Sequence, residues 1–554
     1  MRMPAESVFY RTALRDCMLK TPLPFPSRCR WQAAWLLSIL LVCASQTPPA
    51  LAGTPASLVS PPSLTPPTGL SPPPAPGSTA NKGSTAGKRS TASPGSTAGL
   101  GSTATPSPLD TERTLANGLR IVVHEDHRAP TAVVQVWYRV GSVDESDGHS
   151  GLAHVLEHMM FKGTPKVPVG RFSKIIARAG GKDNAFTGQD HTAYFEQIHR
   201  DQLALALTME ADRMVNLSFR DSDFASEIKV VMEERHLRTD DQPKALVEEQ
   251  LMATALVSNP YRRPIIGWLD DLQHMTADDA RSWYRTWYAP NNAILVVAGD
   301  VQPEQVFRLA QKTFGPLKPH PLPQRRPQQE PEQLGARRIA VRATAGQPYL
   351  AIAWPGPALR DVEHDWEPFA LELLAGVLAG GDTGRFGEHL VHGDQVAVTA
   401  DAGFEDIRRG PGIFSVEGTP APGVTAEALE RSLLAQIHDI QQHGVSEGEL
   451  KRVKAQVISE QIYGHDSTFF QAMQIGTFDA LGLPWREADR VPVRLQQITA
   501  EQVRQVAQRY LIPEHANLAV LEPLPVGKAS APTPVGETGA AVPAAVPAED
   551  HHAH

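Results

Sequence analysis

Cysteine is almost missing from this chain of 554 residues. The three cysteines, Cys17, Cys29 and Cys43, all lie near the N-terminus. Removal of an N-terminal segment that includes them leaves a chain without a thiol, which excludes a disulfide framework and thiol catalysis. The protein must therefore be held together by packed cores, and its length is sufficient for several domains.

An excess of positive charge is missing as well. The chain has 52 lysines and arginines against 61 aspartates and glutamates, a formal net charge of -9. No run of lysine or arginine in the body of the chain offsets this balance. Proteins that bind nucleic acid usually present a basic patch to the phosphates, so we expect no nucleic-acid partner.

The apolar run Trp31–Ala44 is shorter than the roughly 20 residues that a membrane-spanning helix needs. Basic residues including Arg28 precede it, and the small-x-small sequence Ala50–Ala52 follows it. This order is typical of a secretory signal. We predict that residues 1–52 are a signal peptide and that the protein is exported, to the periplasm of a Gram-negative bacterium. An uncleaved membrane anchor is the alternative.

Two segments have too few apolar residues to form a core. Residues 53–108 consist mainly of Pro, Ser, Thr, Gly and Ala, with GSTA repeated in a six-residue register from Gly77. Residues 526–554 form a similar tail that ends in HHAH. Both compositions predict disorder, the first segment as a tether behind the export signal and the second as a solvated tail.

The body of the chain repeats itself at an offset of 223 residues. Met275–Val297 aligns without gaps on Ile498–Val520. Each copy begins with a threonine suited to cap a helix, Thr276 or Thr499, continues as an amphipathic helix, breaks at proline and ends in an apolar strand. The repeat predicts two homologous halves.

We place these halves at residues 109–316 and 334–525, joined by a proline-rich linker at 317–333. The first half mixes strand-like segments such as Ala132–Val140 with long helical segments such as Asp201–Leu217. This mixture predicts an α+β fold in which each half is a sheet covered by helices.

The sequence HSGLAHVLEHMMFKGT, His149–Thr164, contains the most informative motif. On a helix His154 and His158 project from one face, with Glu157 beside them. Two imidazoles and a third ligand can hold zinc with one position open for water, and Glu157 can take the proton of that water. The pattern therefore predicts a hydrolase, although a helix that is merely rich in histidine is the alternative.

The third ligand should come from another helix, and the segment Asp223–Arg238 offers three glutamates. Glu227 and Glu234 are seven residues apart, almost two helical turns, so they lie on the same face of the helix. Glu233 lies outside that face. We assign Glu234 as the ligand and Glu227 as its support, and expect only a surface ion pair for Glu233.

These blocks resemble the pitrilysin-like zinc metallopeptidases of family M16, which share an inverted zinc motif. The resemblance runs from about Leu109 to Pro525, and its matching blocks are Leu115–Val123, Gly151–Thr164, Asn184–Phe195, Glu227–Arg235 and Tyr288–Asp300. It implies a zinc endopeptidase of two homologous αβ domains with one zinc per chain. By resemblance, His154, His158 and Glu234 bind zinc, Glu157 is the base, and Glu227 supports the site.

The resemblance also implies how a peptide substrate binds, as an added strand on a sheet edge beside the metal. That edge corresponds to Asn184, Ala185 and Phe186. The alternative for Asn184 is an ordinary turn residue.

In this family the second domain usually supplies an arginine and a tyrosine, seven residues apart, that hold the substrate. The matching positions here are Val391 and Val398, and no tyrosine occurs between Ala351 and Ile462. We therefore predict a heterodimer with a zinc-less homologue that supplies the pair. The alternatives are a chain that works alone and, from a different class, a non-catalytic assembly subunit on the same fold.

Overall fold

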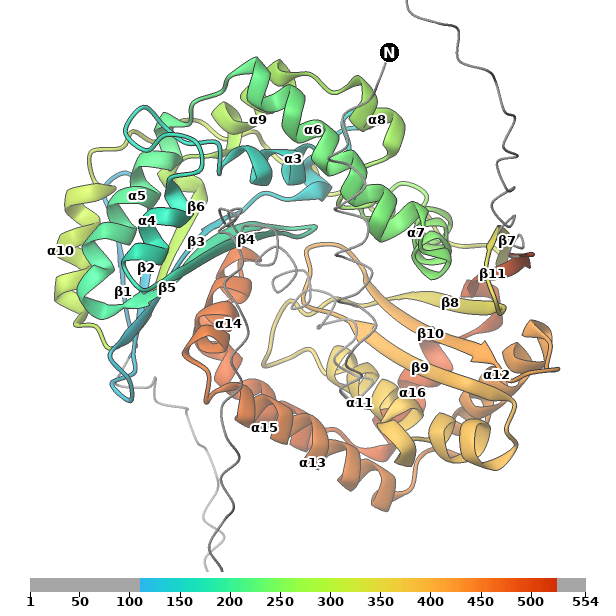
Figure 1. Cartoon of the computed structure of the whole chain (residues 1–554). Helices are drawn as coiled ribbons and strands as arrows, with labels where there is room; N and C mark the ends of the chain where they lie inside the picture. Colours follow the sequence, from blue (N-terminus) through green and yellow to red (C-terminus); the bar gives the residue numbers. More distant parts are fainter. Residues whose placement is uncertain (1–109, 526–554) are drawn as a thin grey trace, which may run out of the picture.

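A computed structural model describes residues 110–525, which fold into two halves, each a β-sheet covered by helices (Figure 1). The predicted leader, tether and tail, residues 1–52, 53–108 and 526–554, lie outside the described residues. The α+β fold predicted from the sequence is confirmed. No helix within the described range is long and apolar enough to cross a membrane.

The first half contains a sheet of six strands in the order β1-β2-β6-β3-β5-β4 within the described residues. β4 pairs with β5 in antiparallel register and forms one edge of the sheet. The strands are β1 (Asp110–Thr114), β2 (Arg120–Glu125), β3 (Thr131–Tyr138), β4 (Lys182–Thr187), β5 (Thr192–His199) and β6 (Ala293–Gly299).

Both faces of the first sheet are buried, because β3 presents apolar side chains alternately to each face. Val134, Val136 and Tyr138 share a core with the helices of the first half, whereas Val133 and Trp137 belong to a core shared with the second half. The helices are α3 (Leu152–Met159), α4 (Phe172–Arg178), α5 (Leu203–Asn216), α6 (Asp221–Arg235), α7 (Pro243–Ala255), α8 (Leu269–His274), α9 (Ala277–Trp287) and α10 (Pro303–Thr313).

The second half contains a sheet in the order β7-β11-β8-β10-β9 within the described residues. Its strands are β7 (Arg337–Thr344), β8 (Tyr349–Gly356), β9 (Ala397–Glu405), β10 (Gly412–Pro420) and β11 (Asn517–Leu524). Its helices are α11 (Glu367–Ala379), α12 (Ala426–His443), α13 (Glu447–Gly464), α14 (Thr468–Ala480), α15 (Val491–Gln497) and α16 (Ala500–Tyr510).

The repeated segment folds alike in both halves. Thr276 caps α9 and Thr499 caps α16, each by accepting the N–H of the third residue of its helix. The strand that follows is β6 in the first half and β11 in the second, and each lies inside its sheet. The two threonine caps predicted from the sequence are confirmed.

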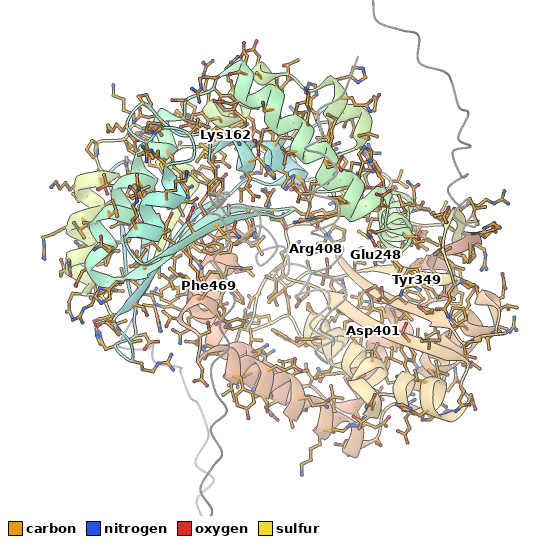
Figure 2. All side chains as sticks on the ribbon, in the orientation of Figure 1. Lys162, Glu248, Tyr349, Asp401, Arg408 and Phe469 are labelled. Atoms are coloured by element: carbon orange, nitrogen blue, oxygen red, sulfur yellow. The ribbon has the colours of Figure 1, made fainter. Side chains whose placement is uncertain are left out.

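The two halves cover each other's sheets with one helix each. α14 of the second half packs on β3 and β6, on the face of the first sheet away from α3, and Phe469 meets Phe195 there with ring centroids 4.9 Å apart (Figures 1 and 2). α7 of the first half packs on β7, β8 and β11, where Glu248 lies beside Tyr349 (Figure 2). Each half therefore completes the core of the other.

A buried carboxylate ties α14 to the first sheet. Asp479, whose side chain is only 4% exposed, lies 2.6 Å from Arg120 Nε and 2.5 Å from Arg139 Nη2. Arg120 begins β2 and Arg139 follows β3, so one aspartate contacts the two strands that flank β6.

Candidate metal centre

The helix that carries the motif, α3, begins at a left-handed glycine, Gly151 (φ 88°), a conformation that other residues rarely adopt. The buried carboxylate of Glu145 accepts hydrogen bonds from the backbone N–H groups of Gly151 (2.9 Å) and Ala153 (2.8 Å). Burial raises the pKa of Glu145 to about 8, and its two oxygens satisfy N–H groups that the first turn of the helix leaves free. The start of the helix is thereby fixed, and with it the direction in which its histidines project.

The structure brings the three predicted ligands together. His154 and His158 project from α3 toward Glu234 of α6, and one donor atom from each residue lies within 4.8 Å of the others. His154 Nε2 is 3.9 Å from Glu234 Oε1, and His158 Nε2 is 3.3 Å from Glu234 Oε2. Two imidazole nitrogens and one carboxylate facing one point form a donor set that suits zinc.

The predicted support residue, Glu227, lies behind His158. Its Oε1 atom is 3.2 Å from His158 Nδ1, and its other oxygen meets the ammonium group of Lys162. A hydrogen bond from Nδ1–H to this carboxylate leaves the lone pair of Nε2 directed at the centre. Glu233, by contrast, is exposed on the same helix, as predicted.

The electrostatics of the three residues match the needs of a cation site. Burial lowers the pKa of His154 to about 4, so its ring is neutral at pH 7. Burial opposes the charge on His158, but hydrogen bonds to Glu227 and Glu234 raise its pKa to about 9. Burial likewise opposes the charge on Glu234, yet His158, His154 and Arg238 lower its pKa to about 2. The carboxylates of Glu227 and Glu234 therefore favour a positive charge at this point.

Glu157 lies next to this centre and is not one of its converging donors. Its Oε2 atom accepts a hydrogen bond of 2.5 Å from Thr187 Oγ1. Burial raises the pKa of Glu157, while the His158 charge and the Thr187 hydrogen bond act in the opposite direction. A carboxylate with a raised pKa, held beside a metal site, is suited to accept a proton.

Three residues near the centre were missed by the sequence reasoning. Thr187 contacts Glu157, Lys162 contacts Glu227, and Arg238 Nη1 lies 2.8 Å from Glu234 Oε1. Arg238 follows its partner Glu234 by four residues, so helical spacing could have found it, whereas Lys162 lies beyond the end of α3 and contacts a residue of another helix. Thr187 had no such local signal, because it lies on a strand.

Two comparisons place the chain among known proteins. Residues 120–268 match the family model described as "Insulinase (Peptidase family M16)", and residues 274–457 match "Peptidase M16 inactive domain". The chain is 33% identical over 350 residues to the zinc protease PqqE of Helicobacter pylori, covering 62% of this chain and 77% of that protein.

The chain belongs to peptidase family M16.

Solved structures share the fold of this M16 chain. A protease from Helicobacter pylori superposes with a TM-score of 0.71 at 29% identity, covering 76% of this chain and 100% of that one. The periplasmic protease PqqL of Escherichia coli superposes with a TM-score of 0.63 at 20% identity over 76% of this chain, which spans only 48% of PqqL. The family is one of zinc-dependent peptidases, and the first half of this M16 chain carries the metal motif.

The residues predicted to bind the peptide lie on the edge strand of the first M16 sheet. Asn184, Ala185 and Phe186 are consecutive on β4, which packs against α3 and pairs with β5 alone among the described strands. Asn184 is therefore a strand residue, not a turn residue. Val391 lies in the π-helical segment Phe386–Gly393, and Val398 lies on β9, 46% exposed.

Proposed function

We propose that this protein is a zinc-dependent endopeptidase that hydrolyses peptides or short unfolded segments. One observation carries the proposal: His154, His158 and Glu234 direct donor atoms at one point, with Glu157 beside it. The alternative, a helix that is merely rich in histidine, does not explain why a glutamate of another helix faces both histidine rings.

The residues present fit one zinc ion per chain. His154, His158 and Glu234 would hold it through two nitrogens and one oxygen, and Glu227 would keep His158 in the required tautomer. His154 Nδ1 is buried without a hydrogen-bond partner among the described residues, whereas Nε2 faces Glu234 and is the atom that would bind the metal. When bound, zinc would supply Lewis-acid activation of water and of the peptide carbonyl.

The chain's own residues would supply the proton transfers. Glu157 takes a proton from the attacking water and delivers it to the nitrogen of the leaving amine. Burial raises its pKa, which makes it a better proton acceptor than an ordinary carboxylate, and Thr187 holds one of its oxygens by a hydrogen bond.

The edge strand β4 would hold the peptide. Main-chain pairing to Asn184, Ala185 and Phe186 accepts many side-chain sequences, because its hydrogen bonds involve only the backbone. Since β4 packs against α3, an added strand would lie beside the metal centre. We infer that the substrate is an extended segment and not a folded protein.

A non-catalytic assembly role is the competing function. Only the second half fits this role, since that half matches the model of an inactive domain and lacks the His-x-x-Glu-His motif. In the position that α3 takes in the first half, the second half has α11, an apolar and almost fully buried helix. The four metal-site residues of the first half favour catalysis.

Three substitutions test the proposed function. We expect Glu157→Gln to abolish hydrolysis while about one zinc per chain remains bound, because Glu157 is a base and not a ligand. His158→Ala and Glu234→Gln should instead lower the zinc content. Metal analysis of the purified variants, beside a peptide-digestion assay, decides the roles. Loss of zinc from Glu157→Gln, with zinc retained by the other two, would reverse the assignment.

We also propose that the active form is a heterodimer. The positions at which family members carry the substrate-holding arginine and tyrosine are Val391 and Val398 here. The similarity to half of PqqL supports pairing, because two chains of this size would together reach the length of that protein. A zinc-less homologue that carries the arginine and tyrosine would complete the site.

A further inference from the structure

The base of the proposed reaction is held by the strand that we expect to bind the peptide. Thr187, whose Oγ1 donates to Glu157, is the last residue of β4 and follows Phe186 directly. It pairs with Thr192 of β5, so its backbone position is set by the sheet. One element therefore controls both the place of the peptide and the place of the carboxylate.

The turn that follows Thr187, residues 188–191, is held by the first half on one side. The carbonyl oxygens of Gly188 and Gln189 accept hydrogen bonds from Ser142 (3.2 Å) and Val143 (3.0 Å). Gly141 lies so close that an added Cβ would meet both carbonyl oxygens at 2.5 Å. The backbone of the turn is thus packed tightly against the segment that precedes α3.

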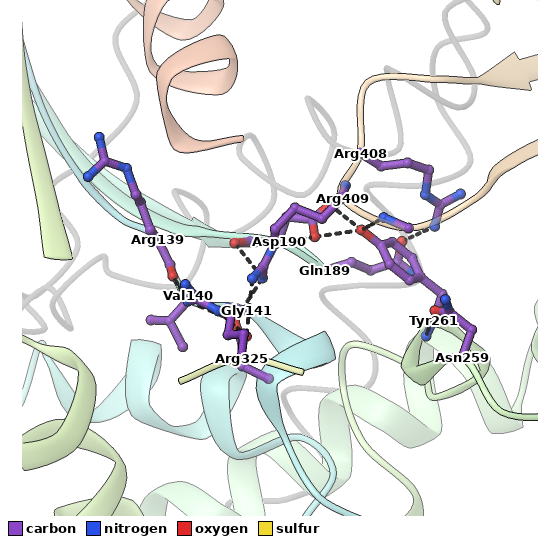
Figure 3. Close-up of polar contacts among 12 residues, drawn as sticks. Arg139, Val140, Gly141, Gln189, Asp190, Asn259, Tyr261, Arg325, Arg408 and Arg409 are labelled. Carbon is purple, nitrogen blue, oxygen red and sulfur yellow. Dashed lines mark hydrogen bonds and ion pairs between the residues drawn. The ribbon is translucent and has the colours of Figure 1, made fainter. Parts of the chain in front are cut away.

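The second half holds the same turn from the other side, as Figure 3 shows. Arg409, in the connection between β9 and β10, donates from Nε to Asp190 Oδ1 at 2.8 Å and from its backbone N–H to Asp190 Oδ2 at 3.2 Å. Its Nη2 atom lies 2.7 Å from Asp144. Arg408 binds the side chain of Gln189, and Tyr261 of the first half also donates to Asp190.

Asp190 is only 5% exposed, so these contacts fix its position. A paired, buried carboxylate that accepts from an arginine, a backbone N–H and a tyrosine has little freedom to move. Only two residues, Gly188 and Gln189, lie between Thr187 and Asp190, and the carbonyl oxygens of both accept hydrogen bonds. Displacement of Asp190 would therefore displace the Thr187 hydroxyl.

We propose that Thr187 is a positioning residue for Glu157 and that Arg409 positions the same base through the turn 188–191. The half without a metal motif thereby acts on proton transfer in the other half. This inference rests on the proposed function, since it takes Glu157 as the base.

Thr187→Val tests the first link, because valine keeps the branched shape and the strand preference of threonine but cannot donate. Misplaced catalytic groups commonly cost up to about 100-fold in rate, so we expect kcat to fall roughly 10- to 100-fold with KM unchanged. Thr187→Ser keeps the donor and should retain most of the activity. The assays use the full chain, together with its partner chain if the pair is the active form.

Two measurements that do not depend on turnover accompany the kinetics. Zinc content should be the same in Thr187→Val as in the wild type. The affinity of the zinc-free protein for a fluorescent peptide should also be unchanged, because the β4 backbone is intact. A loss in either would mean that Thr187 is structural and would overturn the inference.

Arg409→Gln tests the second link in a double-mutant cycle with Thr187→Val. If both residues act on Glu157 in series, kcat of the double variant should be close to that of Thr187→Val alone. If the decreases in kcat of the two single variants multiply in the double variant, Arg409 does not act through Thr187. Arg128→Gln is the matched control, since Arg128 also bridges the halves, to the carbonyl of Asp466, but does not touch the turn.

The outcomes separate the two proposals. If Glu157→Gln still hydrolyses peptides, the proposed function fails. If Glu157→Gln is inactive while Thr187→Val keeps the wild-type kcat, only the positioning inference fails. Equal damage from Thr187→Ser and Thr187→Val would also refute it, because the hydroxyl would then not be the group that matters.

Discussion

His158 uses both of its ring nitrogens. Nε2 faces Glu234 and Nδ1 faces Glu227, so the same imidazole joins the donor set to the residues behind it. Glu227 in turn contacts Lys162. The charge on Glu227 therefore bears on how strongly His158 can donate to a metal, although Glu227 is not a donor itself.

We expect Glu227→Gln to weaken zinc binding by roughly 10- to 100-fold, because the amide is a poorer acceptor for His158 Nδ1–H and leaves Lys162 without its carboxylate. Competition with a zinc chelator measures the change. Glu233→Gln is the matched control on the same helix, since Glu233 is exposed. Equal losses in both variants would mean that helix charge, and not the contact with His158, sets the affinity.

At this scale the sequence was most informative where partners lie on one helix. The spacing of His154 and His158, and of Glu227 and Glu234, follows from helical geometry, and the structure places all four side chains at one centre. Thr187 and Glu157 are 30 residues apart and lie on a strand and a helix. Their contact depends on how β4 packs against α3, which no local pattern encodes.

Among the elements, α14 approaches the first sheet closely. Gly476 lies against the Trp137 ring, and an added Cβ would be only 2.1 Å from that ring. Trp137 is fully buried and cannot move away without opening the core.

We expect Gly476→Ala to lower the free energy of unfolding by about 1–3 kcal/mol or more, as overpacking usually does. Thermal and denaturant unfolding measure the change. Gly448→Ala, in the first turn of α13, is the matched control, because a Cβ there meets no crowded neighbour. That variant should be neutral or more stable by up to about 1 kcal/mol. Equal stability of both variants would contradict the close packing of α14 on the sheet.

The elements themselves were partly predictable. Threonine caps and apolar strands carry local signals, and α9, α16, β6 and β11 lie where the repeat places them. No local signal in the sequence tells which of the two sheets α7 or α14 will cover. Both helices pack on strands that belong to the opposite half of the chain, so their partners are decided only when the two sheets meet.

At the scale of the whole molecule, the missing arginine and tyrosine lead to a prediction about assembly. We expect co-purification with a zinc-less homologue from the same genome to raise kcat by roughly 100-fold or more, the usual worth of a group that stabilises an oxyanion. Size-exclusion chromatography and a fluorogenic peptide assay measure pairing and rate. The Glu157→Gln chain with the same homologue is the control and should stay inactive. Full activity of the isolated chain, unchanged by the homologue, would contradict the prediction.

The mutual covering by α7 and α14 has a bearing on ancestry. α14 begins 225 residues after α7 (468 minus 243), close to the offset of the sequence repeat, so the two helices are counterparts. Two equivalent helices traded between two similar units give the arrangement of a domain-swapped dimer whose protomers have been fused into one polypeptide. After such a fusion one unit can lose its catalytic residues and still be retained by natural selection, because its helix covers the sheet of the other unit.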